Sequence, residues 1–196
     1  MKHYYLLYKP EAEVNYLHLF ELMELAEYTS ETKAYDTIKY TSVAGLAGKL
    51  TFSKSTLDRI IQADSYTPFL SADKANKIIK LENSFTKGCK KPFVCLTDTE
   101  VAFLRKHKDN LLCKYLIYMK YNCGRSPEKQ DFTAKQFLTA CGYSVKSNAQ
   151  LDSISRYNTL MENAGLVSIV RCRDEAGNKR NIYQYNSLYT YKSKDL

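Results

Sequence analysis

Residues 41–61, TSVAGLAGKLTFSKSTLDRII, contain two short amphipathic segments separated by a three-residue turn. Apolar residues recur at helical spacing in residues 43–50 and again in residues 54–63, so both segments are predicted to be helices. Hydroxyl side chains that can cap the two helices stand directly before them: Thr41 or Ser42, and Ser53. Helices joined this tightly cannot lie antiparallel along their full length, so they must cross steeply, which predicts a helix-turn-helix.

A longer helix is predicted before this region and a β-hairpin after it. Residues 13–28 carry apolar residues at helical spacing. The acidic side of this helix consists of Glu21, Glu24 and Glu27. Residues 67–72 and 77–82 are typical of two strands joined by a four-residue turn. A β-hairpin that directly follows a helix-turn-helix is called a wing. Residues 86–92 are basic and contain Gly and Pro, which predicts a linker.

The second half of the chain repeats this plan. A strand at residues 93–96 and a short capped helix ending near Arg105 are predicted to open the second unit. The elements predicted next are a helix at residues 109–121, a capped helix within residues 132–144 that ends at Gly142, a helix at residues 148–164, and strands at residues 166–173 and 179–185. Gly142 and Gly165 are suited to end two of the helices, because glycine adopts the left-handed conformation without steric cost.

Two segments carry a resemblance to a known family. The pattern LAxxLxFSxxTLxRxI at residues 46–61 resembles the helix-turn-helix of bacterial winged-helix regulators, although Thr51 stands where that family usually has glycine. Residues 160–167, LMENAGLV, resemble the junction between the last helix and the wing in the same family. The resemblance implies a mainly α fold with small β-hairpins (α+β), built as two tandem winged-helix domains at residues 1–88 and 89–196. Taken whole, the chain resembles replication initiators and replisome-organising proteins of bacterial plasmids and phages.

The net charge of +8 arises entirely in the second half of the chain. Residues 1–100 contain 13 Lys and Arg and 13 Asp and Glu, whereas residues 101–196 contain 16 and 8. This asymmetry favours a polyanionic partner, although a basic surface also serves solubility alone.

The resemblance also implies which residues contact DNA. The first residues of a recognition helix face base edges, and cations of a wing suit phosphates. The candidate residues are Lys54, Ser55, Thr56, Arg59, Lys74, Lys77, Lys146, Ser147, Asn148, Gln150, Arg156, Arg171, Arg173, Lys179 and Arg180, with Lys80 and Ser153 beside them. The alternative for each candidate is an ordinary solvated face.

No group of residues points to catalysis, a metal or a cofactor. The six cysteines form no C-x2-C pair, and no histidine lies near them at ligand spacing. P-loop, dinucleotide-binding and nucleophile-elbow motifs are absent from the sequence, so we predict no enzymatic activity. No apolar run approaches the roughly 20 residues that span a bilayer, and residues 1–10 lack the apolar core of a secretory signal. These observations predict a cytoplasmic protein without membrane contact.

The sequence therefore predicts a non-enzymatic protein that binds double-stranded DNA, of the replication-initiation or transcription-regulation type. A homodimer would place recognition helices on paired half-sites. The alternative from another class is a protein–protein interaction module, because fold alone does not settle function. The neutral first half, with its acidic helix at residues 13–28, favours a protein partner there. Binding of RNA or of single-stranded DNA is a third alternative.

Overall fold

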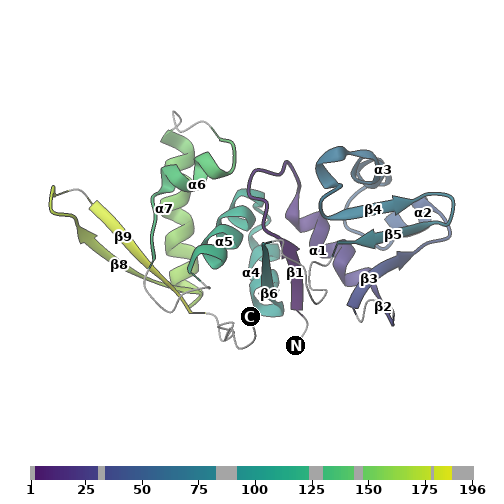
Figure 1. The fold of residues 1–196 in the computed structure, drawn as a ribbon, viewed down its shortest axis with the longest axis horizontal. Coiled ribbons are helices and arrows are strands. Elements are labelled where there is room, and N and C mark those ends of the chain that lie inside the picture. The colour runs from purple at the N-terminus through teal and green to yellow at the C-terminus, as the bar shows by residue number, and fades with distance from the viewer. Residues whose placement is uncertain are drawn as a thin grey trace. The chain divides into compact units, whose positions relative to one another are not determined.

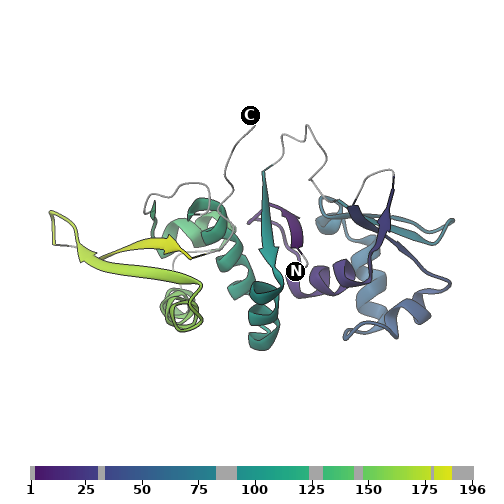
Figure 2. The ribbon, with the colours of Figure 1, turned by 90° about the horizontal axis from the view of Figure 1, so that it is seen from below.

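The computed structural model describes residues 3–30, 34–82, 92–123, 130–143, 148–177 and 179–186. The chain divides into two compact units, Met1–Asn110 and Leu111–Leu196. Both units combine helices with small antiparallel sheets, so the α+β class predicted from the sequence is confirmed (Figures 1 and 2). Of the predicted linker at residues 86–92, residues 86–91 lie outside the described residues.

The first unit contains two separate sheets. Its elements are β1 (His3–Leu7), α1 (Tyr16–Leu25), β2 (Glu27–Thr29), β3 (Ala34–Lys39), α2 (Val43–Ala47), α3 (Lys54–Gln62), a 3-10 turn (Asp64–Tyr66), β4 (Leu70–Asp73), β5 (Ile78–Leu81), β6 (Phe93–Thr97) and α4 (Asp98–His107). Four strands form one sheet in the order β2-β3-β5-β4, and β1 pairs with β6 in the other.

The apolar stripes predicted for the two short helices face the core of this unit. Leu46 of α2 and Leu57 and Ile60 of α3 are buried, as are Ile38 and Ile79 on the inner face of the four-stranded sheet. Burying a side chain of this size stabilises a fold by about 1.5–3 kcal/mol. The two helices are therefore held by tertiary packing, which matters because α2 has only five residues.

The boundary between the units lies later than predicted. Strand β6 and helix α4, expected to open the second unit, belong to the first, because β6 pairs antiparallel with β1. Asn110 also stays with the first unit: its side chain accepts a hydrogen bond from the Tyr16 backbone N–H at 2.8 Å and donates one to the Val14 carbonyl at 2.8 Å. The basic stretch before β6 resembles an interdomain linker, and local pattern does not reveal a pairing between residues so distant in sequence.

The helix predicted at residues 13–28 is shorter in the structure. It begins at Tyr16, where the Asn15 side chain accepts from the Leu17 backbone N–H, and it ends at Leu25 because Ala26 is extended. The last residues of the predicted helix form β2. The strand was missed because Glu27 continues the three-residue spacing of Glu21 and Glu24, which is typical of one side of a helix.

The second unit is built around one long buried helix. Its elements are α5 (Asn110–Cys123, of which Asn110 belongs to the first unit), β7 (Gln130–Asp131), α6 (Ala134–Ala140), α7 (Asn148–Asn163), β8 (Val167–Arg173) and β9 (Lys179–Tyr185). Tyr115, Phe137 and Tyr157 are among the largest fully buried side chains. Gly142 and Gly165 have φ of 75° and 69°, which confirms the predicted helix ends. The hairpin of β8 and β9 extends beyond the helices of its unit (Figures 1 and 2).

The two units contain corresponding elements in the same order. Elements α1, β3, α2, α3, β4 and β5 of the first correspond to α5, β7, α6, α7, β8 and β9 of the second, although the first unit also has β2 after α1 and a 3-10 turn after α3. The strand orders β3-β5-β4 and β7-β9-β8 also correspond, because the early strand pairs with the second strand of the hairpin. The sequence predicted the helices and hairpins but missed β3 and β7, whose partners lie far along the chain.

Candidate nucleic-acid interface

The turn between α2 and α3 is held by side chains on both sides. Ser53 accepts a hydrogen bond from the Thr56 backbone N–H at 3.2 Å and so caps α3 as predicted. The carboxylate of Glu21, on α1, accepts from the Thr51 backbone N–H at 2.7 Å and from the Thr51 hydroxyl at 2.5 Å. Thr51 does not have a positive φ, so this turn does not need glycine. Thr51, which stands where the family usually has glycine, donates both hydrogen bonds to Glu21. A glycine there could donate only the one from the backbone N–H.

We expect Glu21→Ala to lower the free energy of unfolding of the first unit by about 1–2 kcal/mol, because it removes two hydrogen bonds to a charged acceptor on a solvent-exposed surface. Thermal or chemical unfolding followed by circular dichroism measures this change. Glu13→Ala is the matched control, because Glu13 is exposed and lies outside α1. An equal effect of the two substitutions would contradict a specific role for Glu21.

His18 supports the same turn from α1. Its ring lies 4.3 Å from the Phe52 ring between centroids, and its Nδ1 is buried and has no hydrogen-bond partner among the described residues. Burial lowers the pKa of His18, and the nearby Arg59 lowers it further, whereas Glu21 raises it. The folded unit therefore favours the neutral form of this imidazole.

The stability of the first unit should fall as the pH drops below about 6.5, because the unfolded chain then binds a proton that folded His18 resists. The contribution is complete above the unfolded pKa and is lost as the pH falls through the lower, folded pKa. Melting temperatures at pH 7.5 and 5.5 test this expectation, with His18→Gln predicted to show a smaller difference between the two values. A His18→Gln variant with the same pH dependence as the parent chain would contradict it.

The outward face of α3 carries the residues predicted to read DNA. Lys54, Ser55 and Arg59 are exposed, and Thr56 is partly exposed. Gln62 is exposed as well and lies three residues after Arg59, hence on the same face. Sequence reasoning missed Gln62, although its spacing from Ser55 and Arg59 was a usable signal.

The β4–β5 hairpin carries the predicted cations of the first wing. Lys74 and Lys77 are exposed in its turn, and Lys80 is exposed on β5. The Asp73 carboxylate accepts hydrogen bonds from the backbone and side-chain nitrogens of Asn76 at 3.0 and 2.7 Å, and these bonds lower the pKa of Asp73. Lys77 follows with φ of 55°. The hydrogen bonds between Asp73 and Asn76 and the left-handed backbone of Lys77 thus fix the turn.

In the second unit, the exposed face of α7 differs in part from the predicted one. Arg156 is exposed, but Gln150 and Ser153 are only partly exposed, and the Ser153 hydroxyl donates to the Ala149 carbonyl at 3.0 Å. The exposed positions around Arg156 are Asp152, Ser155, Thr159 and Asn163. Lys146, Ser147 and the side chain of Asn148 lie outside the described residues. The polar positions opposite the buried Ile154, Tyr157 and Met161 would have indicated the exposed face.

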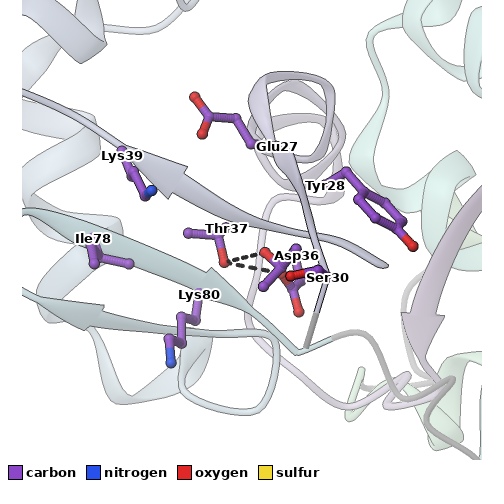
Figure 3. A pocket seen from close by; sticks show the side chains of 9 residues that line it. Glu27, Tyr28, Ser30, Asp36, Thr37, Lys39, Ile78 and Lys80 are labelled. Atoms are coloured by element: carbon purple, nitrogen blue, oxygen red, sulfur yellow. Dashed lines mark hydrogen bonds between the residues drawn. The ribbon is translucent and has the colours of Figure 1, made fainter. Parts of the chain in front are cut away.

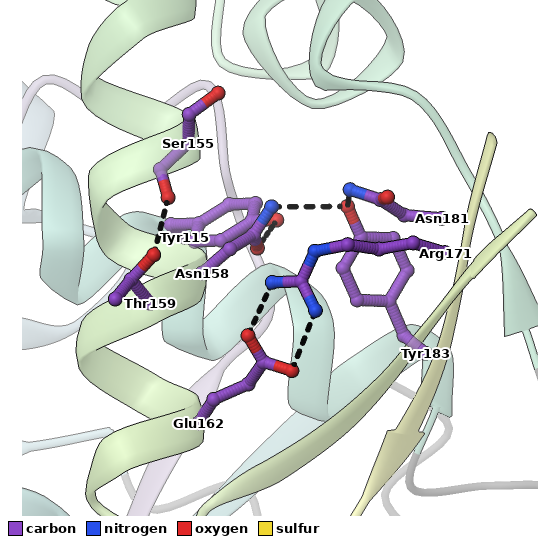
Figure 4. A network of polar contacts seen from close by, with 8 residues as sticks. All are labelled: Tyr115, Ser155, Asn158, Thr159, Glu162, Arg171, Asn181 and Tyr183. Atoms are coloured by element: carbon purple, nitrogen blue, oxygen red, sulfur yellow. Dashed lines mark hydrogen bonds and ion pairs between the residues drawn. The ribbon is translucent and has the colours of Figure 1, made fainter. Parts of the chain in front are cut away.

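The arginines of the β8–β9 hairpin have different surroundings. Arg171 forms a two-pronged ion pair with Glu162 of α7, with Nη1 to Oε1 at 3.0 Å, and this pair lowers the pKa of Glu162 (Figure 4). Arg173 donates to the Gly177 carbonyl at 2.7 Å and remains exposed, as does Arg180. The side chain of Lys179 lies outside the described residues. Arg171 was predicted to contact DNA, but its charge is already engaged by a carboxylate.

A buried polar network joins α5, α7 and the same hairpin. The Tyr115 hydroxyl donates to Asn158 Oδ1 at 2.7 Å, and Asn158 Nδ2 donates to the Tyr183 hydroxyl at 3.3 Å (Figure 4). Asn181 Nδ2 also donates to Tyr183, at 3.1 Å. Burial raises the pKa of Tyr115 well above its usual value. With the Glu162–Arg171 pair, this network fixes the hairpin relative to α7.

The described residues give little support to a metal site or to a reactive thiol. No three His, Cys, Asp or Glu side chains there converge as metal ligands. Cys113, Cys123 and Cys141 are buried, and burial raises the pKa of the Cys123 thiol to about 12, which disfavours the nucleophilic thiolate. No helix within the described part of the chain has the length and apolar character needed to cross a bilayer.

Comparisons with known proteins give no relative. A scan against protein-family models, a search of curated proteins and a search of solved structures each found no match. Function is therefore inferred from the geometry of the two units.

Proposed function

We propose that the chain binds double-stranded DNA through two winged-helix units, without catalysis and without a cofactor. Helix α3 in the first unit and helix α7 in the second enter major grooves, and the hairpins that follow them contact flanking phosphates. The observation that carries the proposal is the repeated succession of helix, strand, two helices and hairpin with corresponding strand orders. A role in replication initiation or transcription regulation agrees with this activity.

The chemistry of the exposed helix faces supports direct reading of base edges. The guanidinium groups of Arg59 on α3 and Arg156 on α7 can donate two hydrogen bonds to the O6 and N7 acceptors of guanine. The Gln62 amide can pair with the N6 donor and the N7 acceptor of adenine. The opposite sides of both helices are buried, so these side chains are presented on rigid elements.

The two hairpins support contact with the phosphate backbone. Lys74 and Lys77 in the first and Arg173 and Arg180 in the second are exposed cations at or near the tips. Arg171 takes a different role here, because its pair with Glu162 positions the hairpin against α7. The four exposed cations are the residues proposed to contact phosphates.

The protein-partner alternative for the first half has less support from the structure. Glu21 holds the turn before α3, and Glu24 accepts from the Tyr4 hydroxyl at 3.1 Å and pairs with Arg105. Two of the three carboxylates that suggested an acidic docking helix are thus used inside the unit. A homodimer remains a prediction. A measurement of the molecular mass of the purified protein in solution tests it.

Fluorescence anisotropy with a labelled duplex of mixed sequence tests the proposal. With about four phosphate contacts, the logarithm of the affinity should fall against log salt with a slope near −3.6, so binding weakens about a hundredfold between 50 and 200 mM salt. An absence of binding at 50 mM salt would refute the proposal and favour the protein–protein interaction module. Selection of bound sequences from a random duplex library then identifies the preferred site.

A further inference from the structure

The outer face of the four-stranded sheet in the first unit is open to solvent along β3. Along β3, Tyr35 and Lys39 are exposed and Thr37 is partly exposed, whereas Asp36 and Ile38 alternate with them and are buried. The register places Thr37 beside Lys80 of β5. Aromatic, hydroxyl and cationic side chains therefore share one open face.

Two exposed tyrosines lie together at one edge of this face. Tyr28 of β2 is the cross-strand partner of Tyr35, and their ring centroids are 5.5 Å apart at 65°. The exposed fractions are 56% for Tyr28 and 59% for Tyr35, whereas Tyr4, Tyr16 and Tyr66 of the same unit are buried. In the described part of the chain, Val170 is the only other large apolar or aromatic side chain exposed in this way.

A hollow of about 430 Å³ is lined by Tyr28, one member of this tyrosine pair. Lys39 and Lys80 line one side of it and Tyr28 lies across Thr37 from them (Figure 3). The Thr37 hydroxyl donates to the Asp36 carboxylate at 2.9 Å, and the Thr29 hydroxyl donates to Thr37 at 3.0 Å. Glu27 also lines the hollow, so its border carries carboxylates as well as lysines.

We propose that this face binds single-stranded nucleic acid. Exposed aromatic rings stack on unpaired bases, and lysines beside them suit the phosphates of the same strand. The exposed Glu27 carboxylate does not suit a phosphate, but it can accept a hydrogen bond from an exocyclic amino group of a base. The face thus offers a complementary group to each part of a nucleotide strand. A duplex does not fit equally well, because its bases are already stacked on one another.

This inference is independent of the proposed duplex interface. Tyr28, Tyr35 and Lys39 lie outside α3 and the β4–β5 hairpin, whereas Lys80 lies on β5 of that hairpin but outside its turn; the second unit contributes no residue to the face. The two activities can therefore be lost separately.

The test uses the full-length chain and a labelled, unstructured oligonucleotide of alternating A and C, about 15 nucleotides long, as DNA and as RNA. Anisotropy at 50 mM salt should show binding of at least one of the two. Tyr28→Ala/Tyr35→Ala should weaken it by about ten- to a hundredfold, whereas Tyr28→Phe/Tyr35→Phe should stay within about twofold of the parent chain, because phenylalanine retains the stacking surface. Duplex binding should be unchanged in both variants.

The lysines provide a second, separate readout. Lys39→Ala/Lys80→Ala should make the slope of log affinity against log salt shallower by about 1.4, because each lost phosphate contact removes about 0.7 for a single strand. Lys9→Ala/Lys106→Ala is the matched control, with the same change of charge at exposed positions outside this face. The control should leave the slope unchanged.

Three results would overturn the inference. The first is no binding of either oligonucleotide by the parent chain at 50 mM salt. The second is unchanged binding after removal of both tyrosine rings in a variant with the parent circular dichroism spectrum. The third is a changed oligomeric state of that variant with unchanged oligonucleotide binding, which would assign the face to a protein contact. Failure of duplex binding alone would leave this inference standing.

Discussion

Replacing Asn158 with alanine should lower the free energy of unfolding of the second unit by about 3 kcal/mol. Asn158 is 6% exposed and links the hydroxyls of Tyr115 and Tyr183, which are also buried. The substitution removes the acceptor that Tyr115 uses and the amide donor to Tyr183. A buried polar group without a partner costs about 1–3 kcal/mol, and the space left by the amide adds to this cost.

Hydrogen exchange measured by mass spectrometry localises the effect, because peptides from α5, α7 and β9 should lose protection together while α1 and α3 remain protected. Asn158→Leu fills most of the volume of the asparagine side chain, but the hydroxyls of Tyr115 and Tyr183 still lose their hydrogen bonds to the Asn158 amide. It should therefore remain destabilised by about 2 kcal/mol.

The triple variant Asn158→Leu/Tyr115→Phe/Tyr183→Phe separates lost hydrogen bonds from lost packing. Removing Asn158 and both hydroxyls together should recover part of the stability lost in Asn158→Leu, because no orphaned hydroxyl remains, although Asn181 Nδ2 loses the Tyr183 hydroxyl as its acceptor. If Asn158→Leu costs less than about 0.5 kcal/mol, the network is not what holds α7 to α5 and the hairpin.

Local features of the fold could be predicted from the sequence because they depend on neighbouring residues. The caps of α2 and α3, the apolar stripes of both helices and the glycines at positions 142 and 165 all act over a few residues. Strand pairings depend on residues far apart, and those of β1 with β6, β3 with β5 and β7 with β9 were not predicted. The error in the boundary follows from the first of these pairings.

The candidate site could be predicted only in part for a related reason. Residue type identifies cations that suit phosphates but does not show which are already paired. Arg171 and Arg173 stand two positions apart on β8, yet only Arg171 reaches the carboxylate of Glu162. Likewise Thr51 looks like a departure from a turn pattern until Glu21, thirty residues earlier, is seen to bind it.

Removing the four exposed cations at or near the tips of both hairpins should weaken binding of duplex DNA by a hundredfold or more. The variant carries Lys74→Ala, Lys77→Asn, Arg173→Ala and Arg180→Ala; asparagine is chosen at position 77 because it tolerates the left-handed backbone there. Each phosphate contact contributes about 0.9 to the salt slope, so four lost contacts should remove about 3.6 and leave little salt dependence. The loss should be similar for all duplex sequences, because phosphates carry no sequence information.

A matched pair tests whether position or net charge is responsible. Lys106→Ala/Lys108→Asn removes the same charge as Lys74→Ala/Lys77→Asn, and Lys108 is also left-handed, with φ of 52°. The hairpin pair should make the salt slope shallower by about 1.8 and the control pair should not. Equal effects would mean that duplex affinity follows net charge alone and that the β4–β5 hairpin is not a wing on DNA.

Arg59→Ala on α3 should produce a different kind of loss. If Arg59 reads a base edge, the variant loses about 1–3 kcal/mol on the preferred sequence and much less on unrelated duplexes, so that discrimination at one position of the site relaxes. The hairpin cations should change affinity without changing preference, and Arg59 should change preference. Should Arg59→Ala instead weaken all duplexes equally, α3 would lie along the backbone, and the proposed placement of this helix in the major groove would be wrong.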